Sequence, residues 1–145
     1  MTVQEWEKTI PEALKADSFW KMKAYRLALY LSDLCWQDVG ILLKDKRTGS
    51  IADQLYRSVG SISSNLAEGY SRSTGKDRAL FYQYAFGSTR ESRDWYFKAR
   101  FVLGEEIVAR RIQAITEIIR LLATMISQQR GYLVREDLPF YNLVG

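Results

Sequence analysis

The pattern of apolar and polar positions divides the chain into four long helical segments. In three of them, apolar side chains recur at steps of three and four residues, which places them on one stripe of an α-helix. The first stripe runs through Trp20, Ala24, Leu27, Ala28, Leu31, Leu34, Cys35, Val39 and Leu42. The second contains Ile51, Leu55, Val59, Ile62, Leu66 and Tyr70, and the last contains Ile107, Ile115, Ile118, Leu122 and Ile126. We therefore expect long helices over about 18–44, 50–72, 76–103 and 105–131.

Residues with capping chemistry indicate how the chain begins. Thr9 and Glu12 have the spacing of a capping box, in which the threonine oxygen and the glutamate carboxylate each accept a backbone N–H. They predict a short N-terminal helix. Asp17 or Ser18 is then expected to cap the first long helix, since either side chain accepts such a bond.

Further caps predict how the long helices are connected. Thr74 with Asp77 is expected to open the third helix, and Gly104 to end it, because glycine adopts the left-handed cap without strain. Connections this short force neighbouring helices to run antiparallel. The fold prediction is a single all-α domain, an antiparallel up-down-up-down four-helix bundle. Its core covers about 18–131, and 132–145 form an extended tail.

The composition argues against an enzyme. The chain has no histidine, so the commonest general base and metal ligand is missing, and the Glu-x-x-His di-metal site of helix bundles cannot form. No glycine loop has the spacing that binds phosphates. We expect no catalytic residue, no metal and no cofactor. The single cysteine, Cys35, cannot form an internal disulfide and is expected to be a buried apolar residue.

The same features bear on where the protein works. A lone thiol suits a reducing compartment. The first residues have neither the basic region nor the apolar core of a signal peptide, and no run of eighteen apolar residues occurs. We therefore expect a cytoplasmic protein that does not enter a membrane.

The second helix carries a polar stripe beside its apolar one. Its members are Gln54, Ser58, Ser61, Asn65, Glu68 and Arg72. The third helix is rich in small residues, which let two helix axes approach closely. The sequence therefore predicts a polar network across the contact, formed by Asn65 and Glu68 with Ser88 and Glu91. Such groups must satisfy one another, because a buried polar group without a partner costs about 1–3 kcal/mol. The predicted role is structural.

Two motifs resemble those of a known family. Residues 54–69, QLYRSVGSISSNLAEG, resemble its Q-L-x-R-A, S-I and N-I-A-E-G elements, although Ser58 and Leu66 replace the usual alanine and isoleucine. Residues 85–91, AFGSTRE, resemble the second element, A-x-G-S-x-x-E. The chain is thus similar, over roughly 18–128, to the four-helix bundle protein family, also called the ribosomal RNA intervening-sequence protein family.

The resemblance implies an antiparallel four-helix bundle without catalytic residues. It also implies a kinship with the accessory variability protein of diversity-generating retroelements. That relative forms a pentameric, barrel-like assembly, partners a reverse transcriptase and binds nucleic acid through a basic surface. We therefore expect a homo-oligomer, by preference a pentamer, that associates with RNA or DNA and with a reverse transcriptase.

The distribution of charge and aromatic residues leaves the binding surface open. The net charge is +4, and Lys and Arg gather with acidic neighbours at both ends of the expected bundle. The candidate phosphate contacts are Arg72, Lys76, Arg78, Arg110 and Arg111. The alternatives are a plain solvated surface and a structural scaffold that docks a protein. The third helix has more aromatic residues than one core stripe accepts, so oligomer contact, core packing and base stacking all remain possible.

Overall fold

The computed structural model describes residues 1–131, so the tail expected over 132–145 lies outside the described residues. Helices occupy most of this part of the chain, and it contains no strand. The all-α prediction is therefore confirmed. The elements are α1 (Val3–Glu7), α2 (Glu12–Lys15), the 3-10 helix η1 (Ser18–Lys21), α3 (Lys23–Leu42), the 3-10 helix η2 (Lys46–Thr48), α4 (Gly49–Tyr70), α5 (Gly75–Lys98), α6 (Arg100–Leu103) and α7 (Glu105–Gln129).

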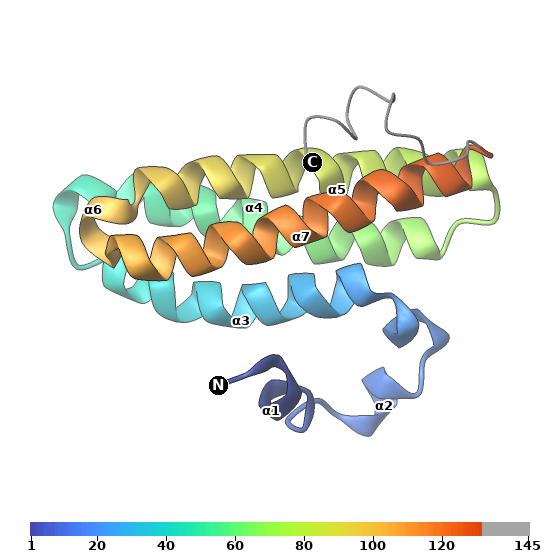
Figure 1. Cartoon of the computed structure of the whole chain (residues 1–145), viewed down its shortest axis with the longest axis horizontal. Helices are drawn as coiled ribbons and strands as arrows, with labels where there is room; N and C mark the ends of the chain where they lie inside the picture. The colour runs from blue at the N-terminus through green and yellow to red at the C-terminus, as the bar shows by residue number, and fades with distance from the viewer. Residues whose placement is uncertain (132–145) are drawn as a thin grey trace.

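The four long helices, α3, α4, α5 and α7, lie side by side (Figure 1). Helix α4 packs between α3 and α5, and α7 closes the arrangement by contacting both α5 and α3. The short α1 packs against the outer side of α3, where Trp6 is buried and its Nε1 donates to Asp33 Oδ2 at 2.7 Å. Every helix within residues 1–131 is too short or too polar to cross a lipid bilayer.

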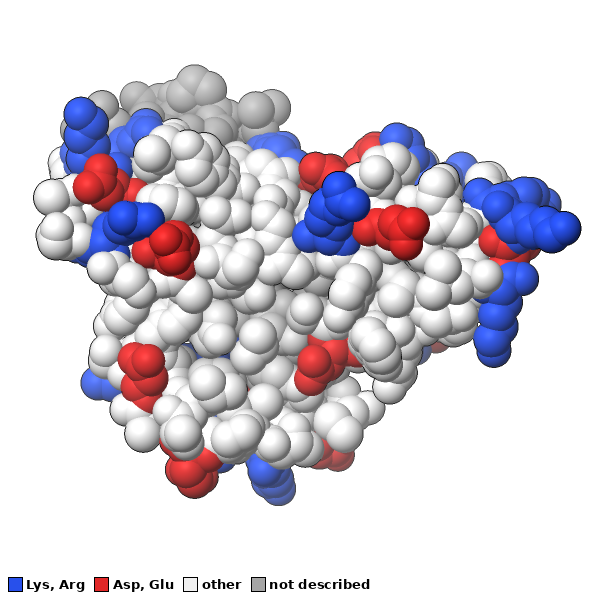
Figure 2. Space-filling view, turned by 180° about the vertical axis from the view of Figure 1, so that it is seen from behind, with Lys and Arg blue, Asp and Glu red and all other residues white. Residues whose placement is uncertain are grey.

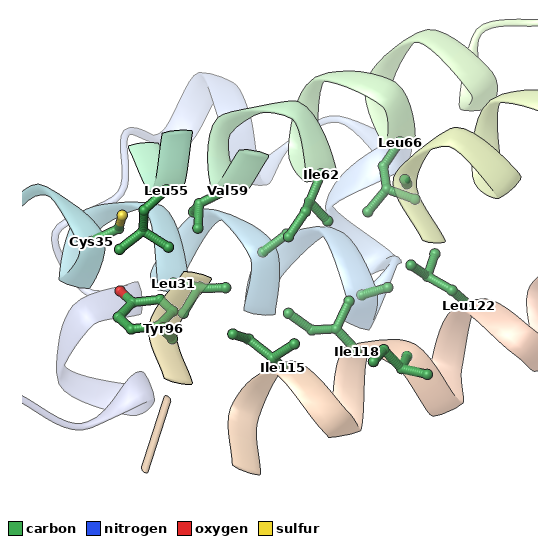
Figure 3. Packing of buried hydrophobic residues seen from close by; sticks show 14 of the residues in the cluster. Leu31, Cys35, Leu55, Val59, Ile62, Leu66, Tyr96, Ile115, Ile118 and Leu122 are labelled. Carbon is green, nitrogen blue, oxygen red and sulfur yellow. The ribbon is translucent and has the colours of Figure 1, made fainter. Parts of the chain in front are cut away.

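The expected apolar stripes face one another in the interior (Figure 3). Leu31 of α3, Leu55 and Ile62 of α4 and Ile115 of α7 are at most 1% exposed. Burying an aliphatic side chain of this size contributes about 1.5–3 kcal/mol. The ring of Tyr96, from α5, packs in the same cluster and brings a hydroxyl group into it. This apolar interior holds the four helices together.

Two of the expected N-terminal caps differ from the structure. The capping box lies at Thr2 and Glu5, at the start of α1, whereas the Thr9 hydroxyl donates to the Trp6 carbonyl at 2.7 Å. Asp17 does act as a cap, but it opens η1, and the extended backbone of Met22 separates η1 from α3. The first long helix therefore begins at Lys23, five residues after the predicted start.

The predicted N-terminal cap of α5 is confirmed, whereas α5 itself ends at Lys98 and Gly104 ends the short α6 that follows it. Thr74 Oγ1 accepts from the Asp77 N–H at 3.1 Å, and Gly104 has a φ of 92°, in the left-handed region that favours glycine. The helix is interrupted once, at Ala99, where ψ is 0° and the short α6 begins. The connections are thus short, as predicted.

Candidate nucleic-acid interface

The five predicted phosphate contacts lie at opposite ends of the long helices. Arg72, Lys76 and Arg78 surround the connection from α4 to α5, whereas Arg110 and Arg111 belong to the first part of α7. Figure 2 shows Lys and Arg side chains toward both ends of the visible face and in a smaller group between them, with acidic side chains beside each group. The five residues therefore form two groups on one subunit.

Arg111 does not face solvent. Its Nε and Nη2 donate to the two carboxylate oxygens of Asp38 at 2.8 and 3.2 Å, and the Tyr96 hydroxyl donates to Asp38 Oδ2 at 2.7 Å. Asp38 is only 2% exposed. Burial alone would lower the pKa of Arg111, but the hydrogen bond and the charge of Asp38 outweigh it and raise the pKa. The prediction that Arg111 contacts phosphate is therefore wrong, because its charge compensates a buried carboxylate.

Two other predicted arginines have carboxylate partners on their own helices. Arg72 donates to Glu68 at 2.8 Å, and Arg110 donates to Glu106 at 2.6 Å. Both pairs are at the helical i, i+4 spacing and face solvent. Pairing leaves each arginine at the surface but reduces the positive charge it offers to a phosphate.

Lys76 and Arg78 have no carboxylate partner within residues 1–131. Lys76 is exposed. Arg78 donates to the side-chain oxygen of Gln129 at 2.7 Å and to the carbonyl of Arg72 at 3.0 Å, which ties the start of α5 to the end of α7. Arg130, exposed at the end of α7, lies next to this contact. Of the predicted basic residues, those at this end of the molecule have the fewest carboxylate partners.

The predicted polar network forms only in part. Ser88 Oγ donates to Ser61 Oγ across the α4–α5 contact at 2.9 Å, and Asn65 donates to the carbonyl and hydroxyl oxygens of the same Ser61. Glu68 and Glu91 are exposed and do not join it. The expectation is wrong for these two glutamates, because each lies on the exposed surface and accepts a bond from its own helix: Glu68 from Arg72 and Glu91 from the Trp95 Nε1.

Small hydroxyl residues make the buried part of this contact. Ser92 Oγ donates to Ser58 Oγ at 3.0 Å and also bonds the Ser88 carbonyl, with Ser58 4% and Ser92 0% exposed. Ser58 belonged to the polar stripe, and the small residues of α5 indicated the close approach. The sequence thus located the helix contact and two of its polar residues, Asn65 and Ser88, but it missed the buried Ser58–Ser92 pair and wrongly included Glu68 and Glu91.

The sequence contained one indication of the buried cluster of Asp38, Tyr96 and Arg111, which the sequence analysis did not use. Asp38 lies between Cys35 and Leu42 on the buried stripe of α3, where a carboxylate requires a partner. Cys35 is fully buried, as predicted. Its burial, and to a smaller extent the charge of Asp38, raise the pKa of the thiol to about 12, although the Tyr96 hydroxyl acts in the opposite direction. The thiol is therefore protonated and unreactive at neutral pH.

An exposed apolar surface covers the outer side of α3 and α4; we call it the α3–α4 face. Trp36 is 67% exposed and Tyr56 44%, and their rings contact each other with centroids 5.9 Å apart. Leu43 is also exposed. A Cβ atom added at Gly40 or Gly60 would meet nothing within 4 Å, so packing inside the chain does not explain these helical glycines. Apolar side chains beside small residues are typical of a protein–protein contact.

These features define a small all-α protein with basic ends and an exposed apolar face. Within residues 1–131, no three His, Cys, Asp or Glu side chains come together as a possible metal site. The model of the 23S rRNA-intervening sequence protein family matches residues 20–124. The chain belongs to this family. The match covers α3 to α6 and most of α7, and it leaves α1 and α2 outside. No curated protein and no solved structure matches the chain.

Proposed function

We propose that the chain is an antiparallel up-down-up-down four-helix bundle that forms a homo-oligomer and associates with nucleic acid, without an enzymatic activity of its own. The observation that carries the nucleic-acid role is the end of the molecule at the α4–α5 connection. There, Lys76, Arg78 and Arg130 present positive charge without a carboxylate partner among the described residues. Membership of a family linked to ribosomal RNA intervening sequences supports the same role.

Assembly would strengthen a weak site. One subunit has a net charge of only +4. A ring repeats the basic end in every subunit, and linked weak sites gain avidity without any new contact. The α3–α4 face supports such an assembly, since it combines exposed apolar side chains with glycines that allow close approach. We favour a pentamer, as the family resemblance implies.

The nucleic-acid role is tested by the binding of a mixed RNA pool across a salt series. Each neutralised phosphate releases counterions, so affinity is expected to fall steeply with salt and to depend little on sequence. The variant Lys76→Gln/Arg130→Gln should bind more weakly and with a shallower slope. An absence of binding at low salt, or binding that neither salt nor this variant changes, would overturn the role.

The assembly is tested by light scattering at micromolar concentration. The wild-type chain is expected to scatter as an oligomer, and Gly60→Leu to scatter as a monomer because the new side chain blocks the α3–α4 face. Phe101→Ser is the control, since it removes an aromatic residue that is 83% exposed on another face. A monomeric wild type would contradict the assembly.

The second candidate is a protein-docking scaffold, and the α3–α4 face is the observation that favours it. On this account the face is covered by a different protein, for which a reverse transcriptase is our proposed partner. A reverse transcriptase gene beside a template repeat would favour the combined role with nucleic acid. A wild-type chain that is monomeric and binds no RNA would leave the scaffold as the better account.

A further inference from the structure

Arginine and phenylalanine side chains share one face of α5. Phe86, Arg90, Arg93 and Phe97 follow one another at steps of four, three and four residues, so they share a helical face. At 1.5 Å per residue, this part extends about 16 Å. Arg100 and Phe101 of α6 continue it. We call these six residues the arginine–phenylalanine stripe; α5 and α6 are labelled in Figure 1.

The three arginines of the stripe have no carboxylate partner within residues 1–131. Arg93 donates to the Thr116 hydroxyl of α7 at 3.3 Å. Burial lowers the pKa of Arg93, and the charge of Arg90 lowers it further. Asp94 is the acidic residue that lines the same shallow groove, and its carboxylate is held by Lys98 at 2.7 Å. Like charges are therefore concentrated here without compensation.

Aromatic rings contact two of these three guanidinium groups. Arg90 lies over the Phe86 ring at 4.9 Å from its centroid, and Arg100 lies 4.0 Å from the Phe97 centroid and 4.2 Å from that of Phe101. Phe97 is 51% and Phe101 83% exposed, so both rings still offer surface to a ligand. Stacking of this kind fixes a guanidinium at little entropic cost. Arg100 also donates one bond to the Phe97 carbonyl at 3.0 Å, and its other N–H donors remain for a ligand.

A single-stranded nucleic acid has the complementary pattern. Its phosphates require cations, and its bases have accessible π-faces that stack on aromatic side chains and on guanidinium planes. A duplex offers the phosphates but keeps its bases stacked inside. From this complementarity we propose that the arginine–phenylalanine stripe binds single-stranded nucleic acid. The inference rests on the proposed function, names the class of nucleic acid and adds a second surface to the basic end at the α4–α5 connection.

The stripe is separate from the other surfaces discussed. It lies on the α7 side of α5, where Ile112 and Thr116 of α7 border it. The α3–α4 face belongs to two other helices. A subunit can therefore use the α3–α4 face for assembly and leave the stripe open.

The test uses fluorescence anisotropy of the full chain with labelled mixed-sequence 12-mers of single-stranded RNA, single-stranded DNA and duplex. Arg90→Gln/Arg100→Gln is expected to lower the affinity for the single strands at least tenfold and to reduce the salt slope by about 1.4, at about 0.7 per phosphate. The matched control is Arg72→Gln/Arg110→Gln, which removes two arginines that have carboxylate partners. It should change the affinity less than threefold.

A second variant isolates the aromatic contribution. Phe101→Ser, at a position too exposed to affect folding, should weaken single-strand binding about fivefold or more and leave duplex binding unchanged. If the wild-type chain binds none of the three probes at low salt, the proposed function fails as well. If it binds them but the Arg90/Arg100 variant binds equally well, only the stripe is refuted. Equal affinity of the wild type for duplex and single strands would also refute it.

Discussion

Two groups of arginines in this molecule have opposite environments. Arg111 lies between α7 and α3 with a bidentate bond to the buried Asp38, and its side chain is 15% exposed. Arg90 and Arg100 lie on the outside of α5 and α6, stacked on phenylalanine rings and without a carboxylate partner among the described residues. The same side chain thus stabilises the fold in one region and leaves its charge available to a ligand in the other.

This difference shows that a phosphate-binding site cannot be identified by counting basic residues. What matters is whether each guanidinium already compensates a carboxylate. A buried charge costs several kcal/mol unless it is paired, so Arg111 cannot leave Asp38 for a ligand. A surface arginine without such a partner can contact a phosphate without leaving a buried carboxylate uncompensated. The predictions below test this division, beginning with the largest expected effect.

Replacing Arg111 should have the largest effect on stability. Arg111→Gln leaves the Asp38 carboxylate buried without a compensating charge, so we expect the free energy of unfolding to fall by about 3–5 kcal/mol. Arg100→Gln should change it by less than about 0.5 kcal/mol, as is usual at the surface. Urea denaturation followed by circular dichroism measures both. Equal losses of stability in the two variants would contradict the division between a buried, paired arginine and an unpaired surface arginine.

Removing the third member of the buried cluster should have an intermediate effect. Tyr96→Phe keeps the ring in the core but removes the hydroxyl that donates to Asp38 at 2.7 Å. A hydrogen bond to a charged group contributes about 1.5–3 kcal/mol, and we expect a loss of that size in the same assay. A loss below 0.5 kcal/mol would mean that Asp38 needs only Arg111.

The Cys35 thiol, which lies beside the Asp38, Tyr96 and Arg111 cluster, should make the stability of the fold depend on pH. The pKa of Cys35 is about 12 in the folded chain, compared with about 8.5 for an unperturbed cysteine. The unfolded chain therefore loses this proton first, and stability should fall as pH rises from about 8.5 toward 12. At pH 9.5 the expected loss from this residue is about 1.4 kcal/mol. It is measured as the difference in pH dependence between the wild type and Cys35→Ala, and identical pH profiles would contradict it.

Glu68 should have the smallest effect. Because it is exposed and pairs only with Arg72 on its own helix, Glu68→Ala should cost about 0.3–0.5 kcal/mol. A fall of 1–3 kcal/mol in the free energy of unfolding would instead support the buried network that the sequence predicted. Thermal melting of the variant beside the wild type decides between the two values.

The sequence predicted most of the fold because helical periodicity is local. The stripes containing Leu55 and Ile115 and the cap at Thr74 follow from spacing within a few residues. The pairing of Asp38 with Arg111 joins residues that are 73 positions apart, so no local pattern reveals it. Whether a polar stripe faces a neighbour or solvent depends on how the helices are rotated, which is why Glu68 was misplaced. The stripe on α5 escaped notice because its residues were counted as surplus aromatics and separate charges.

The most direct test of the account is an NMR titration of the arginine Nε–H resonances in an arginine-labelled full chain. A single-stranded RNA 12-mer is added at low salt, and every arginine is observed in the same spectrum. The account predicts that the resonances of Arg90, Arg93 and Arg100 shift while that of Arg111 stays in place. A shift of Arg111, with the three resonances of the stripe unchanged, would contradict it.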